Sequence, residues 1–148
     1  MFWFYFELIM WFLWQLPQNL VALVMMPFLG KMRLVRFDLY CWAFECERMS
    51  GGISLGNFIF LDPDAAKREA TILHEYGHVI DSHKFGWLYL FVIGIPSLCW
   101  AMFKPSNKCY YDFYTESRAN THAGLKVVKN QYGCYTYIPK EENNENKE

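Results

Sequence analysis

The stretch Asp62-Pro-Asp-Ala-Ala-Lys-Arg-Glu-Ala-Thr-Ile-Leu-His-Glu-Tyr-Gly-His-Val-Ile-Asp-Ser-His-Lys84 carries the strongest fold signal in this chain. Asp62 suits an N-cap, because its carboxylate can accept a hydrogen bond from a free backbone N–H. Pro63 suits the first helical position, where its missing N–H costs nothing. Good helix formers follow, and Gly86 lies just beyond the end of the pattern. The sequence therefore predicts one helix from Asp62 to about Lys84.

Three residues of this helix form the pattern His-Glu-x-x-His: His74, Glu75 and His78. Positions four apart share one helix face, so both imidazoles can reach a single ion about 2.0 to 2.1 Å away. Glu75 is offset from that pair and can take a proton from a water on the ion. The pattern predicts a metal clamp with a general base beside it, and the alternative is a pair of ordinary surface or core histidines.

A zinc ion needs a third protein ligand, which leaves its fourth position for water. The candidates are Asp81, His83, Asp112, Glu116 and His122. Asp81 and His83 continue the same helix and either turn away from the clamp or lie too far along it. Glu116 fits better, because Ala119 permits a close helix approach and Asn120 can hold a ligand imidazole. The alternative for Glu116 is a solvated charge on an exposed helix face.

The composition indicates one small domain that is associated with a membrane. With 148 residues and a net charge of −1, we expect a single domain at 1–138 and a disordered, charged tail at 139–148. The 14 basic and 15 acidic residues lack the excess of positive charge typical of nucleic-acid binding, so no nucleic-acid partner is expected. Five cysteines without a Cys-x-x-Cys pair indicate reduced, mostly buried thiols.

Two apolar segments, 1–30 and 85–103, are rich in aromatic residues and predict contact with a lipid bilayer. The first lacks the basic start and cleavage site of a signal peptide. It could form one kinked span or two shorter helices, because Pro17 interrupts it. The second carries no charge and contains Gly94 and Pro96. Its alternative is a buried core helix of a soluble enzyme.

The metal hypothesis restricts the path of the second apolar segment. A single crossing by 85–103 would place His78 and Glu116 on opposite sides of the membrane. We therefore expect a reversal near Gly94 and Pro96, or an even number of crossings, and favour two broken apolar hairpins packed on each other. Basic residues flank both segments, so the positive-inside tendency predicts that the catalytic part faces the cytoplasm. These residues are Lys31, Arg33, Arg36, Lys84, Lys104 and Lys108.

The remaining segments predict a small α+β domain. Residues 31–61 predict an antiparallel sheet of two or three strands, since 32–40 alternate partly in period two and 53–55 and 58–61 are β-branched or aromatic. A short helix with Asp112 as its cap should end before Gly124. Residues 125–138 leave a strand and a short helix equally open.

Taken together, His74-Glu-x-x-His78 and, 38 residues later, Glu116-x-x-Ala119-Asn120 resemble the gluzincin clan of zinc metalloproteases. The metzincin extension is absent, because Asp81 and Lys84 stand where it requires Gly and His. A site-2-type intramembrane protease is disfavoured, because charged residues precede the motif. Three further stretches look like a poorly characterised bacterial family of small membrane-associated zincin-like proteins: Trp14-Gln-Leu-Pro-Gln-Asn19, Leu88-Tyr-Leu-Phe-Val-Ile-Gly-Ile-Pro-Ser-Leu98 and Phe113-Tyr-Thr-Glu-Ser-Arg-Ala-Asn120.

The resemblance implies a minimal zincin-like domain acting as a membrane-associated zinc metalloendopeptidase. His74, His78 and Glu116 would hold Zn²⁺, and Glu75 would be the general base. Asn120 would support a ligand imidazole, although the clan usually carries Asp there and a neutral amide adds no charge.

A peptide or protein substrate of such an enzyme would lie along an edge strand within 53–61. The oxyanion donor stays open among His122, Tyr114 and Tyr111. The alternative function is a membrane-anchored zinc-binding or interaction protein without hydrolysis. The oligomeric state is not predicted.

Overall fold

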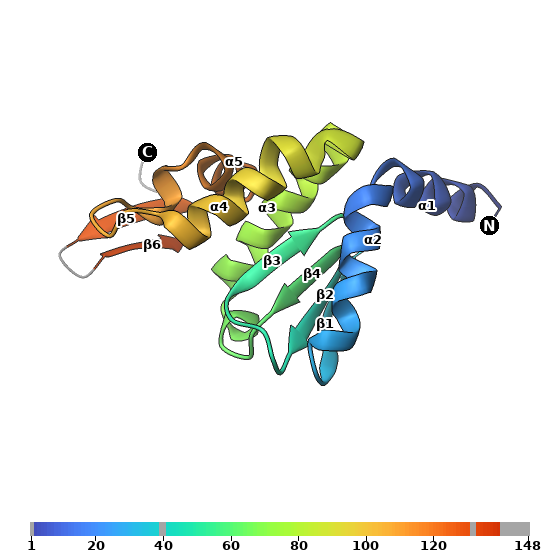
Figure 1. Ribbon diagram of the computed structural model, residues 1–148, viewed down its shortest axis with the longest axis horizontal. Coiled ribbons are helices and arrows are strands. Elements are labelled where there is room, and N and C mark those ends of the chain that lie inside the picture. The colour runs from blue at the N-terminus through green and yellow to red at the C-terminus, as the bar shows by residue number, and fades with distance from the viewer. Residues whose placement is uncertain (1, 39–40, 131–132, 140–148) are drawn as a thin grey trace, which may run out of the picture.

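The computed structural model describes residues 2–38, 41–130 and 133–139 and confirms the mixed α+β class (Figure 1). The helices are α1 (Phe2–Trp14), α2 (Leu16–Met25), α3 (Glu69–Phe85), α4 (Ile95–Phe103) and α5 (Tyr114–His122). The strands are β1 (Met32–Asp38), β2 (Cys41–Cys46), β3 (Gly52–Leu55), β4 (Phe58–Leu61), β5 (Lys126–Asn130) and β6 (Gly133–Tyr137). Short helical turns connect them: η1 (Met26–Phe28), η2 (Ala65–Lys67), η3 (Gly86–Leu88), η4 (Leu90–Gly94, a π-helix) and η5 (Tyr110–Asp112).

The main sheet has four strands in the order β1-β2-β4-β3, and β2 runs parallel to β4. The expectation of two or three strands, all antiparallel, was therefore wrong. The β3–β4 hairpin folds back so that β4 pairs with β2 and leaves β3 at the edge. Because β4 lies between β2 and β3 and both of its faces are covered, all four of its residues are buried. Its sequence is accordingly a continuous apolar run.

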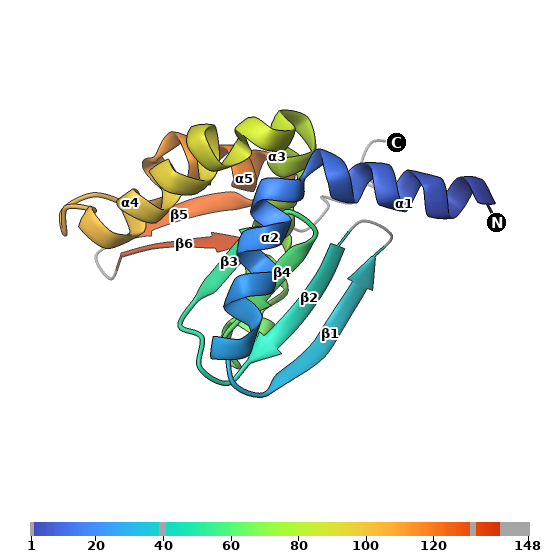
Figure 2. The same ribbon diagram turned by 45° about the vertical axis from the view of Figure 1, so that its right-hand side comes forward.

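Two apolar layers cover the two faces of this sheet. Ile59 and Leu61 of β4 belong to one buried cluster together with Ile72 and Val79 of α3. Phe58 and Phe60 alternate with them and belong to a second cluster that includes Ala22 of α2. Figure 2 shows the result, with α2 in front of the sheet and α3 behind it. The sheet thus holds the His-Glu-x-x-His helix on one face and the N-terminal apolar segment on the other.

The helix that carries the motif begins later than predicted. Asp62 accepts hydrogen bonds from the backbone N–H groups of Asp64 (2.8 Å) and Ala65 (2.6 Å), and so caps η2 instead of α3. These and the bond from Gly51 hold the pKa of Asp62 below its ordinary value. Arg68 is extended, and α3 starts only at Glu69. The C-terminal end is close to the prediction, because Gly86, with φ of 51°, stops the helix after Phe85.

The first apolar segment forms two helices that are bent by 86° at a break around Gln15, so the alternative of two shorter helices is the one observed. Three polar side chains at the break are fully buried: Gln15, Gln18 and Asn19. Gln18 donates to Ser82 Oγ and to the Gly86 carbonyl, both at 2.9 Å, and Ser82 donates to Gln15 Oε1 at 2.7 Å. The break is therefore fixed against the end of α3.

The second apolar segment differs from the expected hairpin. The chain turns back after α3, which ends just before Gly86 (Figure 1), and η4 continues into α4 without a reversal at Gly94 or Pro96. The segment is buried only in part: Gly86, Tyr89 and Ile93 are buried, whereas α4 contains no buried residue. Among the described residues, no single helix has both the length and the apolar character to cross a bilayer; only the bent α1–α2 pair passes that test jointly, by length and composition.

The C-terminal part closes against the segment that precedes α5. Residues 126–130 and 133–137 pair as the antiparallel strands β5 and β6, which settles the open choice in favour of strands. Cys109 and Cys134 form a disulfide, so the prediction of reduced thiols was wrong for this pair. It holds for Cys41 and Cys46, which are buried and free, and burial raises the pKa of Cys41 to about 12. The predicted disordered tail lies outside the described residues except for Pro139.

Candidate metal centre

Helices α3 and α5 approach each other closely at one point, where Gly77 meets Ala119. A Cβ atom at Gly77 would collide with the backbone carbonyl of Ala119. Ala119 is itself fully buried, as expected for a small residue at a helix crossing. This contact brings His74 and His78 of α3 opposite Glu116 of α5. The two sequence motifs therefore meet across a single helix–helix interface.

Replacing Gly77 with Val is expected to destabilise the protein by about 3 kcal/mol, because backbone atoms must move to admit the side chain. Thermal unfolding followed by circular dichroism measures the change. Gly124→Ala is the matched control: nothing lies within 4 Å of its added Cβ, although its φ of +66° adds a smaller backbone cost. Equal stability of the Gly77→Val variant and the parent would contradict the close crossing.

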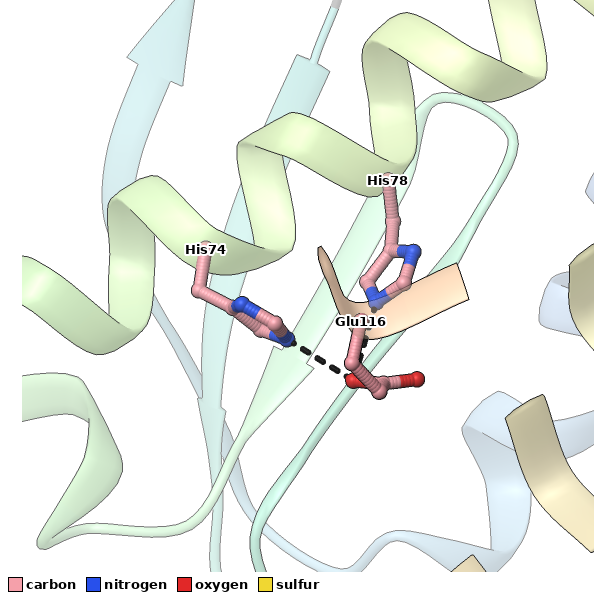
Figure 3. Close-up of side chains that lie close together, drawn as sticks. All are labelled: His74, His78 and Glu116. Atoms are coloured by element: carbon pink, nitrogen blue, oxygen red, sulfur yellow. Dashed lines mark hydrogen bonds and ion pairs between the residues drawn. The ribbon is translucent and has the colours of Figure 1, made fainter. Parts of the chain in front are cut away.

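The predicted ligands meet at one point (Figure 3). The Nε2 atoms of His74 and His78 lie 3.1 Å and 3.5 Å from the Oε2 atom of Glu116. The candidate ligand atoms all lie within 4.8 Å of one another, and all three residues are buried, so this group could hold a metal ion. Two donors bound about 2.05 Å from a tetrahedral ion lie about 3.3 Å apart, which matches the two observed separations.

The electrostatics of the group favour an ionised carboxylate. Burial opposes the charge of Glu116, but hydrogen bonds to His74 and His78 outweigh it and hold the pKa of Glu116 far below its ordinary range. Burial likewise lowers the pKa of His74, yet Glu116 and the charge of Glu75 raise it above its usual value overall. A metal cation bound by the three side chains would take the place of a proton between the imidazoles and the carboxylate.

Further side chains orient the candidate ligands. Asn120 Oδ1 lies 2.8 Å from Nδ1 of His74, which leaves the Nε2 atom of that ring free to face Glu116. Glu116 Oε1 accepts hydrogen bonds from Ser97 and, at 3.0 Å, from Thr115. Asn120 therefore lies where it can hold the His74 imidazole in place, as the sequence predicted. Ser97 was missed, because no local pattern links a serine of α4 to a glutamate nineteen residues later.

Glu75 lies next to the ligand group but points to the edge strand. Its Oε2 atom accepts a hydrogen bond from Ser54 Oγ of β3 at 2.7 Å. A Cβ atom at Gly52 would collide with the Glu75 carboxylate, so glycine in β3 makes room for it. The side chain thus reaches the sheet edge beside the three candidate ligands without being one of them.

The other ligand candidates are placed elsewhere. Asp81 is fully buried and pairs with Arg118 (2.7 Å) and His122 (2.9 Å), which ties α3 to α5 on another part of their interface. The His83 ring contacts the Trp11 ring at 4.9 Å. Asp112 forms a salt bridge with Lys129 at 2.7 Å. Only Glu116 completes the histidine pair.

Of the three tyrosines at 110, 111 and 114, Tyr110 lines the cavity beside the candidate ligands and the other two do not. Tyr114 donates its hydroxyl to the Val92 carbonyl, and the Tyr111 ring packs edge-on against His74 at 5.5 Å. Tyr110, which the sequence analysis did not consider, lines a cavity together with Glu75, His78 and Glu116. Burial and the charges of Glu116 and Glu75 raise the pKa of Tyr110, so its phenol stays protonated and can donate.

This cavity has a volume of about 380 Å³ and extends from the ligand group between α2, β3 and α4. Its polar end is formed by six side chains: Glu75, His78, Glu116, Ser54, Ser97 and Tyr110. The remainder is apolar. Glu75 is therefore accessible to a molecule that enters the cavity, which an isolated buried carboxylate would not be.

Comparison with known proteins found no matching family model, no matching curated protein and no matching solved structure.

Proposed function

We propose that the protein is a membrane-associated, zinc-dependent metalloendopeptidase of the gluzincin type. The observation that supports it most strongly is the placement of Glu75 at the inner end of an open cavity, beside a buried group of two imidazoles and one carboxylate. This donor set suits zinc, which binds nitrogen and oxygen ligands with tetrahedral geometry and keeps a position open in catalytic sites. A metal clamp without an adjacent accessible carboxylate would have favoured simple metal binding.

His74, His78 and Glu116 would hold the ion, which when bound supplies a water of lowered pKa and polarises a carbonyl group. Glu75 then accepts the proton of the attacking water and donates it to the leaving amine. Ser54 fixes the Glu75 carboxylate from the sheet side. Tyr110 is our candidate donor for the oxyanion, since it lines the same cavity and its hydroxyl is hydrogen-bonded there to Ser97 and Glu116. His122 and Tyr114 are instead paired with Asp81 and with the Val92 carbonyl.

A substrate peptide would add to the sheet at β3. This strand is at the edge of the sheet, so alternate main-chain N–H and C=O groups face away from β4 and can pair with an extended chain. Glu75 and the ligand group lie along this edge. A peptide bound there would present its carbonyl carbon to the water that Glu75 activates.

Association with a lipid bilayer is part of the proposal. Large apolar side chains are exposed on α1, α2, η1, η4 and α4, among them Trp3, Phe28, Phe91, Met102 and Phe103. Many large exposed apolar side chains on neighbouring segments are typical of a protein or membrane contact. The cytoplasmic orientation predicted from the basic residues stays a prediction, and the Cys109–Cys134 disulfide indicates the opposite side, because structural disulfides form in oxidising compartments.

The experiment is metal analysis combined with a peptide assay in detergent. We expect one zinc per chain, hydrolysis of internal peptide bonds, loss of at least about 100-fold of the rate on chelation, and recovery when zinc is returned. Stoichiometric zinc without hydrolysis of any peptide would favour the non-hydrolytic zinc-binding alternative. Absence of zinc and of any other bound metal would contradict both.

A further inference from the structure

The cavity beside the ligand group has walls from both apolar segments. Val21 and Met25 of α2 form one side, and Leu98 and Ala101 of α4 form the other. Residues 85–103 and 8–30 contain no Asp, Glu, Lys or Arg, so the cavity carries no charged side chain beyond its catalytic end. The N-terminal segment therefore contributes directly to the space in which a substrate would lie.

The mouth of the cavity is open and apolar. Val21 is 40% exposed and Leu98 is 52% exposed, although both line the cavity, so the space opens outward between α2 and α4. A charged substrate side chain placed there would lose its hydration without finding a partner. A large apolar side chain would instead pack against the apolar cavity wall without losing any hydrogen-bonded hydration.

The edge strand adds a conformational requirement. Tyr89 donates a hydrogen bond to the Ser54 carbonyl at 3.3 Å, so part of the β3 edge is already occupied. The stretch near Gly52, beside Glu75, remains for main-chain pairing. An extended segment pairing there would direct alternate side chains toward the cavity.

We infer that the substrate is an extended polypeptide segment with large apolar side chains beside the cleaved bond, and that α2 is a wall of its binding groove in addition to any contact with lipid. This inference rests on the proposed peptidase function. It assigns Val21, Met25, Leu98 and Ala101 as specificity-determining positions.

The test compares two valines of the same helix. Both Val21 and Val24 are exposed on α2, but only Val21 lines the cavity. In detergent micelles, the parent is expected to cleave a peptide with Leu and Phe beside the scissile bond at least about tenfold more efficiently, by kcat/KM, than a matched peptide with Ser and Asp. Val21→Lys should lower kcat/KM for the apolar peptide about tenfold or more, and Val24→Lys should leave it within about twofold.

Binding separates this inference from the peptidase proposal. Fluorescence anisotropy of the same labelled peptides on the zinc-loaded Glu75→Gln variant needs no hydrolysis. Tighter binding of the apolar peptide, weakened when Val21→Lys is added but not when Val24→Lys is added, supports the groove even if no peptide is cleaved. Equal binding of both peptides, or equal effects of the two lysines in folded protein, would overturn it.

Discussion

Glu75→Gln is expected to lower kcat/KM for peptide hydrolysis by about 10²- to 10⁴-fold, the usual contribution of a general base. Gln has nearly the same shape and can still accept the hydrogen bond from Ser54, but its amide cannot take a proton from water. The measurement is hydrolysis of a fluorogenic peptide by purified protein, with zinc content determined on the same sample. Zinc should remain at one per chain, because Glu75 is not among the three ligands.

Glu69→Gln is the matched control for this prediction. Glu69 belongs to the same helix and forms an exposed salt bridge with Arg36, and neither residue lines the cavity. Exposed pairs of this kind contribute little to stability, so the control variant should keep the activity of the parent. Hydrolysis that survives Glu75→Gln unchanged would mean that the general-base assignment is incorrect.

Glu116→Gln is expected to lower zinc affinity by more than about 100-fold and to abolish hydrolysis with it. The replacement keeps the volume of the buried side chain and its capacity to accept from Ser97 and Thr115, while the anionic ligand oxygen is lost. Zinc affinity is measured by competition with a chromogenic chelator. Because the Glu116 side chain is buried, circular dichroism accompanies the titration to show that the variant is folded.

Asp112→Asn is the control for zinc binding, since Asp112 was a ligand candidate by sequence and lies in an exposed salt bridge with Lys129 in the structure. Its zinc affinity should equal that of the parent. If Glu116→Gln binds zinc as tightly as Asp112→Asn does, Glu116 is not a ligand and the third ligand must be sought elsewhere.

The sequence by itself determined those features that depend on neighbours three or four residues apart. His74 and His78 share a helix face wherever that helix packs, and the same holds for Glu116, Ala119 and Asn120. The choice of Glu116 from five candidates followed from this local periodicity, and the structure brings it to both histidines. The end of α3 at Gly86 was also local, because it depends on one backbone conformation.

The tertiary structure alone decided the contacts between residues far apart in the chain. The parallel pairing of β2 with β4, the disulfide between Cys109 and Cys134, and the hydrogen bonds from Ser54 and Ser97 join segments whose proximity no short pattern encodes. The reversal at Gly86 also depends on a distant residue, because the buried Gln18 side chain donates a hydrogen bond to the Gly86 carbonyl at the end of α3. Periodicity assigns a residue to a face, but packing decides what that face meets. The cavity exists only because α2, β3 and α4, which are far apart in the sequence, line one space.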